Sequence, residues 1–202
     1  MVRTRTVKPQ PTDLCRIMAK HGSDKSPLWT GKRKSHDYTV LYDELFSKWR
    51  EDAITVVECG VHTGASLGGW KEYFYKVRLY GLDIDLSRCR ESMQWLCVPL
   101  DQTNAEQAKR TMRFIGSPVE CQIIVDDGLH NPSGAIPFFT EAFPYLAKDG
   151  YYVVEDVKPK HLEATVAGMK ASHPEARITV HDRRYPGSKY DNILIIATHE
   201  SN

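Results

Sequence analysis

The stretch ITVVECGVHTGAS, residues 54–66, decides the fold class. Its first six residues are mostly apolar, as in a buried β-strand, and a loop with two glycines follows. Beyond this loop, Leu67, Trp70 and Phe74 fall on one face of a helix. A strand, a glycine loop and a helix in this order indicate an α/β protein with a ligand site beyond the carboxyl end of the strand.

The same alternation of short apolar runs and helical patterns continues toward the C-terminus. Several runs are apolar throughout, which is typical of parallel strands that are buried on both faces. The predicted strands are residues 54–59, 78–83, 96–100, 121–126, 150–155, 177–182 and 192–198. The predicted helices are residues 66–76, 86–95, 104–115, 134–147 and 160–173, with Asn104 as the N-cap of the third.

Strand–helix alternation implies right-handed crossovers and helices on both faces of the sheet. The last two predicted strands are joined by RRYPGSKYD, residues 183–191, with no helix between them. So short a connection favours an antiparallel hairpin. The sequence therefore predicts a doubly wound α/β fold with a mostly parallel, seven-stranded sheet whose last strand is antiparallel.

The length of 202 residues suits one full-sized core, and the net charge of +1 argues against a nucleic-acid-binding protein. Residues 1–50 hold 11 Lys and Arg against 5 Asp and Glu, whereas the remainder holds 16 against 21. We therefore expect an N-terminal extension, residues 1–50, with a partly disordered tail (1–11) and helices near 12–20 and 39–50 that cap the ligand site. Residues 51–202 form the predicted ligand-binding domain.

The five cysteines are an odd number without a CxxC pair, which indicates reduced thiols and no disulfide framework or zinc site. No apolar run approaches transmembrane length, and the first residues lack the apolar segment of a signal peptide. We therefore expect a cytoplasmic protein without a membrane partner.

The loop ECGVHTGAS, residues 58–66, departs from the dinucleotide fingerprint GxGxxG because His62 takes the place of the middle glycine. That glycine lets the backbone approach a pyrophosphate, so a cofactor without one fits better. Asp83, at the end of the second strand, is placed to hold ribose hydroxyls. Asp101 and Gln102, after the third strand, suit an adenine edge. Together these loops predict a site for a nucleoside without phosphates.

Adjacent acids follow two neighbouring strands of the predicted sheet. Asp126 and Asp127 end the fourth strand, and Glu155 and Asp156 end the fifth. Three or four carboxylates at one edge repel each other unless a cation joins them. Oxygen ligands favour Mg²⁺, or else Mn²⁺ or Ca²⁺, and a hydroxyl bound to such an ion becomes more acidic. His130, three residues after Asp127, is then placed to take the proton as general base.

The ExGxxxG loop, the acid that ends the second strand and the terminal hairpin resemble the class I S-adenosylmethionine-dependent methyltransferases over residues 54–198. The resemblance implies S-adenosylmethionine as cofactor, on a Rossmann-like methyltransferase fold. His62 is a departure, since many members have glycine there. The cofactor-binding residues predicted in this way are Tyr38, Glu58, Gly60, His62, Gly64, Ser66, Asp83, Asp101, Gln102 and Asp126.

DDGLH followed by ED resembles, more narrowly, the metal-dependent macrolide sugar O-methyltransferases of the mycinamicin and macrocin type and the related cephalosporin hydroxylase group. This resemblance implies that Asp127, Glu155 and Asp156 hold Mg²⁺ or Mn²⁺, and that His130 is the catalytic base beside Asp127. HGSDK (21–25) and HDYTVLY (36–42) also resemble the stretch that precedes the fold in this family. There, Tyr38 or Tyr42 is expected to close over the cofactor. The extra N-terminal region of the larger members is expected to be lacking.

The predicted function is methyl transfer from S-adenosylmethionine to a hydroxyl of a small molecule, such as a sugar or another vicinal diol, with a divalent metal. One alternative is a hydroxylase or oxidoreductase on the same scaffold, but the sequence shows no triad of two histidines and a carboxylate at suitable spacing. Another is a cofactor-binding subunit without catalysis, which the intact DDGxH and ED pairs argue against. Homo-oligomerisation stays open.

Overall fold

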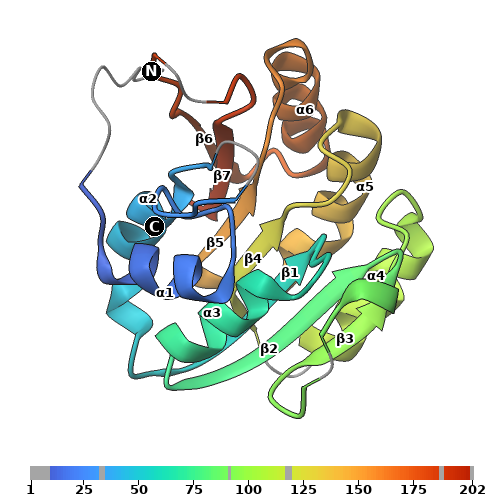
Figure 1. Ribbon diagram of the computed structural model, residues 1–202. Coiled ribbons are helices and arrows are strands. Elements are labelled where there is room, and N and C mark those ends of the chain that lie inside the picture. The colour runs from blue at the N-terminus through green and yellow to red at the C-terminus, as the bar shows by residue number, and fades with distance from the viewer. Residues whose placement is uncertain (1–9, 32–34, 91, 117–119, 187–188, 201–202) are drawn as a thin grey trace.

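The computed structural model describes residues 10–31, 35–90, 92–116, 120–186 and 189–200, so most of the tail predicted for residues 1–11 lies outside it (Figure 1). Its core is a seven-stranded sheet in the order β3-β2-β1-β4-β5-β7-β6. The strands are β1 (Ala53–Cys59), β2 (Lys76–Asp83), β3 (Leu96–Pro99), β4 (Cys121–Asp126), β5 (Leu146–Val154), β6 (Ala176–Asp182) and β7 (Ile193–His199).

Strand direction in the sheet follows the length of the connections. β1 to β5 are joined through crossovers and pair in parallel, whereas β7 pairs antiparallel with both β5 and β6. The chain reaches β7 from β6 through the short connection at residues 183–192, which holds no helix in its described part. The predicted doubly wound fold with an antiparallel last strand is confirmed.

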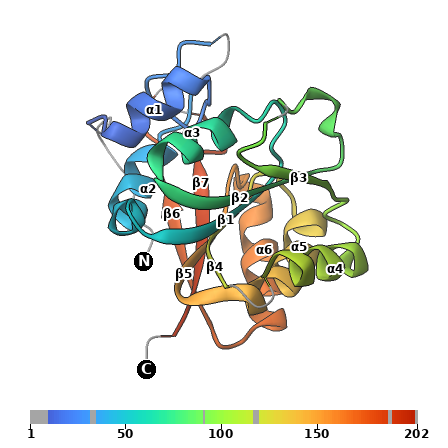
Figure 2. The same cartoon turned by 90° about the horizontal axis from the view of Figure 1, so that it is seen from below.

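Helices cover both faces of the sheet (Figures 1 and 2). One face carries α1 (Asp13–His21), α2 (Tyr38–Phe46) and α3 (Ala65–Tyr73), and the other carries α4 (Ala105–Gly116), α5 (Pro132–Ala142) and α6 (Pro159–Ser172). Because strand side chains alternate, Val56 and Val125 pack toward the first helix set, and Val57 and Ile124 toward the second. Helices α1 and α2 of the predicted extension thus share a core with the sheet.

The helix predicted over residues 86–95 is wrong. In the described part of this range only Leu86–Arg88 is helical, as the 3-10 helix η2. The Asp85 side chain accepts from the Ser87 amide and starts a tight turn, and Cys89 is already extended. The helix predicted over 134–147 ends at Ala142, because its last residues belong to η3 (Phe143–Tyr145) and to β5.

The predicted N-cap at Asn104 is confirmed. Asn104 caps α4, since its side-chain oxygen accepts from the Gln107 amide at 3.0 Å. All five cysteines are free thiols, although Cys89 and Cys97 are only half-buried, with their sulfur atoms 3.2 Å apart. Among the described residues, none of the helices has the length and apolar character needed to cross a membrane.

Candidate active site

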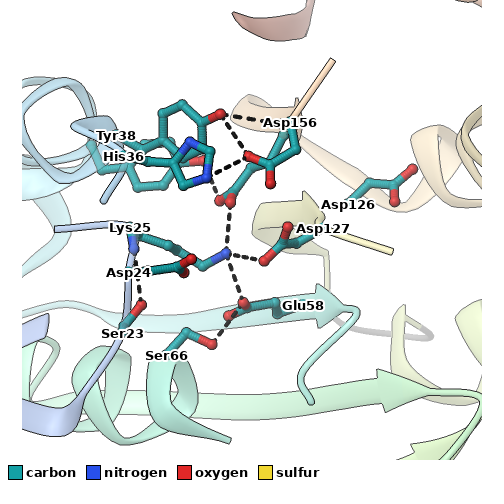
Figure 3. A network of polar contacts seen from close by, with 12 residues as sticks. Ser23, Asp24, Lys25, His36, Tyr38, Glu58, Ser66, Asp126, Asp127 and Asp156 are labelled. Atoms are coloured by element: carbon teal, nitrogen blue, oxygen red, sulfur yellow. Dashed lines mark hydrogen bonds and ion pairs between the residues drawn. The ribbon is translucent and has the colours of Figure 1, made fainter. Parts of the chain in front are cut away.

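Acidic side chains converge at the carboxyl ends of three adjacent strands, β1, β4 and β5. Pairing of Cys59 with Asp126, and of Asp126 with Val154, brings these strand ends level. Glu58 lies on β1, Asp127 follows β4, and two acids follow β5. The topology therefore collects the four carboxylates of Glu58, Asp127, Glu155 and Asp156, which we call the acid cluster (Figure 3).

Lys25, from the segment between α1 and α2, inserts its ammonium group into the acid cluster (Figure 3). The ammonium donates to Asp127 Oδ2 and, at 2.6 Å, to Glu155 Oε2, and it lies 3.2 Å from Glu58 Oε1. Only 3% of the Lys25 side chain is exposed. Burial alone would lower the pKa of Lys25, but the three carboxylates outweigh it and raise that pKa well above its ordinary value.

Helix α2 supplies further donors to the acids that follow β5. Tyr42 donates to Glu155 Oε1 at 2.6 Å, so both oxygens of this carboxylate have partners. Burial raises the pKa of Glu155 well above its usual range. Tyr38 donates to Asp156 Oδ1 at 2.7 Å, and His36 Nε2 lies 3.2 Å from the same oxygen. Burial acts to raise the pKa of Asp156, but these contacts hold it below the ordinary value.

Asp127, His130 and Asp156 form a group that can hold a metal ion. Each offers one ligand atom, and these atoms lie within 4.8 Å of one another. His130 Nε2 is 4.0 Å from Asp127 Oδ1, and His130 Nδ1 is a buried nitrogen without a hydrogen-bond partner in the described chain. Two carboxylates and an imidazole that still has an unpaired nitrogen suit a divalent cation of the Mg²⁺ or Mn²⁺ kind.

Local backbone geometry fixes this group. His130 and Asp156 both have positive φ, at 54° and 53°, in a region that residues with side chains rarely adopt.

Burial raises the pKa of Asp127 to about 6, with Asp156 adding to the rise and Lys25 opposing it. The ammonium of Lys25 thus offsets the effect of burial on Asp127 only in part.

Two of the three predicted metal ligands belong to this group, and the third does not. Asp127 and Asp156 face one another beside His130, whereas Glu155 is engaged by Lys25 and Tyr42. A role for Glu155 in metal binding therefore stays a prediction. Asp126, the first of the paired acids, turns away from this group and accepts from Gln102 at 2.6 Å.

Two cavities adjoin the acid cluster. The smaller, of about 320 Å³, is lined by residues from the ends of four strands, β1 to β4, among them Asp83, Asp101, Gln102, Gly128 and His130. The larger, of about 550 Å³, is lined by residues of the 60–66 loop and the 22–29 segment, among them Ser23, Lys25, Trp29, His62 and Ser66. Both cavities share Gly60, His62 and Asp127, so they meet where the glycine loop contacts the acid cluster.

The glycine loop is held between Asp83 and Asp127. The His62 amide donates to Asp83 Oδ2 at 2.8 Å, and His62 keeps a positive φ of 46° although it is not glycine. A Cβ atom on Gly60 would lie 2.0 Å from the Asp127 carbonyl oxygen, so only glycine lets these loops pack together. Gly64 is the N-cap residue of α3 and also has a positive φ.

Several predicted cofactor residues bind protein groups in this structure. Glu58 is fully buried and accepts from Ser66 and Trp70, both at 2.7 Å, which anchors α3. Gln102 bridges two loops by also accepting from the Leu129 amide at 2.7 Å. Tyr38 lies at Asp156 and lines neither of the two cavities. Cofactor contacts of these residues therefore stay predictions.

Lys25 and His36 are the site residues that sequence reasoning missed. Both fall in the HGSDK and HDYTVLY stretches, which were noted only for their family resemblance. A lysine in a polar loop is normally a solvated residue, and nothing local shows that Asp127 and Glu155, more than 100 positions away, are its partners.

Comparisons with known proteins place these observations in a family. No family model matches the chain. It is 36% identical over 159 residues to an 8-demethyl-8-alpha-L-rhamnosyl tetracenomycin-C 2'-O-methyltransferase of Streptomyces olivaceus, with 75% of this chain and 39% of that protein covered. It is 33% identical over 129 residues to a mycinamicin VI 2''-O-methyltransferase of Micromonospora griseorubida, with 60% and 32% covered. The chain spans less than half the length of these curated relatives.

Solved structures agree on the fold. The MycE methyltransferase from the mycinamycin biosynthetic pathway, in complex with Mg and SAH, superposes with a TM-score of 0.70 at 23% identity, covering 94% of this chain and 56% of that one. Human methyltransferase-like protein 13 in complex with SAH gives a TM-score of 0.57 at 15% identity, covering 77% and 76%. By fold and sequence, the chain belongs with the class I S-adenosylmethionine-dependent methyltransferases, and its relatives are sugar O-methyltransferases of macrolide and polyketide glycosides.

Proposed function

We propose that the chain transfers a methyl group from S-adenosylmethionine to a sugar hydroxyl of a glycosylated natural product, with the help of a divalent cation. One observation carries this proposal. Asp127 lines both cavities and also belongs to the candidate metal group with His130 and Asp156. An acceptor oxygen held at that group would therefore lie next to a cofactor in the cavities, as a direct transfer requires.

The cofactor is proposed to lie across the two cavities. Asp83 and Asp101 line the smaller one and present carboxylates of the kind that hold ribose hydroxyls and an adenine amine. The 60–66 loop and Ser66 line the larger one, which leaves the amino acid part of the cofactor there. The methyl group would then point to where the cavities meet, at Asp127.

The cation is proposed to bind Asp127 and Asp156, with Glu155 as the third predicted ligand. When bound, it makes the acceptor hydroxyl more acidic and fixes its position. His130 is proposed to take the hydroxyl proton on an imidazole nitrogen, since its ring lies within the group and one nitrogen is unpaired. Tyr38 and His36 both contact Asp156 Oδ1 and hold this side chain in place.

We infer a hydroxylated small molecule as the acceptor and a cytoplasmic location, the latter because all five thiols are free. A methyl-transfer assay tests the function. The chain would be given S-adenosylmethionine and matched pairs of glycosylated polyketides and their aglycones, with Mg²⁺ or with EDTA. We expect methylation of a sugar hydroxyl on the glycosides alone, lost with EDTA and restored by excess Mg²⁺. Methylation of the aglycones, or transfer that ignores EDTA, contradicts the proposal.

A further inference from the structure

The ammonium group of Lys25 lies between two carboxylates of the acid cluster. Its nitrogen is within hydrogen-bond distance of Asp127 Oδ2 and of Glu155 Oε2 at once. Asp127 follows β4 and Glu155 follows β5, so the ammonium joins the two strand ends as a shared cation would. The same two residues are among the three proposed metal ligands.

A divalent cation shared by Asp127 and Glu155 cannot coexist with this ammonium. A doubly charged cation and an ammonium group would then lie on the same pair of carboxylates, with little solvent to screen their repulsion, because 3% of the Lys25 side chain and 1% of the Glu155 side chain are exposed. The other oxygen of Glu155 already accepts from Tyr42. Occupation of the predicted ligand set therefore requires that Lys25 withdraws.

The surroundings of Lys25 allow such a withdrawal. Lys25 itself lines the larger cavity, with Ser23, Asp24 and Trp29 from the same segment. A lysine side chain has a flexible stem of four carbons, so its ammonium can move out of the acid cluster while the backbone stays in place. The Lys25 carbonyl still accepts from the Thr39 amide at 3.3 Å, which ties the backbone to α2.

We propose that Lys25 is a positioning residue that holds the acid cluster together without metal and competes with the divalent cation for Asp127 and Glu155. This inference rests on the proposed function. Metal binding and insertion of Lys25 are then mutually exclusive. The lysine keeps the carboxylates from repelling one another until the cation arrives, and it moves into the larger cavity when the cation binds.

Chemical labelling of Lys25 in the wild-type chain tests the exchange directly. The protein would be reductively methylated with formaldehyde and cyanoborohydride at fixed pH, with MgCl₂ or with NaCl of equal ionic strength, and labelling at each lysine read by peptide mass spectrometry. We expect Lys25 to be protected in NaCl and labelled in MgCl₂. Lys48, whose side chain is 46% exposed, is the internal control and should be labelled equally in both.

Calorimetry on a lysine variant supplies a second measurement. Lys25→Met keeps the apolar stem and removes the ammonium, so Mg²⁺ no longer meets a competitor and should bind about ten-fold or more tightly than to the wild type. Lys48→Met removes the same charge elsewhere and should leave Mg²⁺ affinity unchanged. Lys25→Arg restores a cation and should return the affinity toward the wild-type value.

The outcomes separate this inference from the function on which it rests. Mg²⁺ binding with exposure of Lys25 supports the exchange. Mg²⁺ binding measured in the wild type while Lys25 stays protected overturns the exchange and leaves the proposed metal site standing. Absence of any Mg²⁺ binding overturns both, and the labelling experiment reads out on the wild type even if Lys25→Met fails to fold.

Discussion

Carboxylates follow strands at two places on the same rim of the sheet, yet their surroundings differ. Asp83 accepts from two backbone amides, those of His62 at 2.8 Å and Asp85 at 3.0 Å. The Thr103 hydroxyl and amide lower the pKa of Asp101. At the acid cluster, burial instead raises the pKa of Asp127 and Glu155. We propose that the first set accepts hydrogen bonds from the cofactor and that the second binds a cation.

The N-terminal residues that pack over the acid cluster, which we call the covering segment, account for this difference in surroundings. Lys25, His36, Tyr38 and Tyr42 all come from the first 50 residues, and all point at the acid cluster. The smaller cavity, with Asp83 and Asp101, has no lining residue from this part of the chain. An acid at a strand end thus acquires its partners and its charge state from the residues that pack over it.

Substitution of a residue of the proposed metal group should lower turnover strongly and leave cofactor binding nearly unchanged. His130→Ala removes the proposed base and should lower turnover about 10²- to 10⁴-fold, the usual range for a general base. Asp156→Asn removes the charge of a proposed ligand that lines neither cavity, and should cost a similar factor. Calorimetry with S-adenosylhomocysteine should show nearly wild-type binding for both variants. If both lose cofactor binding, the assignment of roles fails.

For a residue of the smaller cavity, where the cofactor is proposed to lie, we expect a loss of cofactor binding and not of turnover. Asp83→Asn should weaken S-adenosylhomocysteine binding about 10- to 100-fold, since hydrogen bonds to a charged group contribute about 1.5–3 kcal/mol. Turnover at saturating cofactor should change little. Asp85→Asn is the matched control, because this neighbouring carboxylate only accepts from the Ser87 amide and lines neither cavity. Equal losses in both variants would show that the effect is structural.

The sequence predicted one half of this comparison better than the other. Apolar alternation and the helix-free link at 183–191 were enough for the sheet, and strand ends were enough to bring Asp83, Asp101 and the acid cluster to one rim. Each of those inferences uses residues that are close in sequence, or the general rule that strand ends meet.

The partners of the acids could not be predicted, because they depend on packing between distant segments. Lys25 reaches Glu155 across 130 positions, and Tyr42 reaches it across 113. The failed helix at 86–95 has a local cause instead, since a side-chain turn at Asp85 competes with the helical pattern. Sequence patterns therefore do not predict the contacts that a polar segment makes when it packs over a site.

Removal of one donor should show how much the covering segment stabilises the acid cluster. Tyr42→Phe leaves the buried Glu155 with one partner fewer and should lower the free energy of unfolding without metal by about 1.5–3 kcal/mol. Tyr73→Phe is the control, because that hydroxyl donates at 2.6 Å to Asp43, a partly exposed carboxylate, and its loss should cost about 0.5–1.5 kcal/mol. Urea unfolding in EDTA measures both, and equal costs would contradict the special status of the acid cluster.

The acid cluster should also make metal binding depend on pH. The pKa of Asp127 rises from an ordinary 3.8 to about 6, so the folded chain holds a proton in this window that the unfolded chain has lost. Stability without metal should therefore fall as pH rises from about 4 to about 6. A cation binds the ionised carboxylate, so Mg²⁺ affinity should fall below pH 6, by up to about ten-fold per pH unit for one proton.

Calorimetry at pH 5, 6 and 7.5, with thermal melts in EDTA and in Mg²⁺, measures both trends. Cofactor binding should be the contrasting case, because the hydrogen bonds from Thr103 lower the pKa of Asp101, which leaves that carboxylate ionised throughout this range. S-adenosylhomocysteine affinity should thus stay level between pH 5 and 7.5 while Mg²⁺ affinity drops. Parallel pH profiles for the two ligands would mean that one set of carboxylates serves both, and the division between the two regions would be lost.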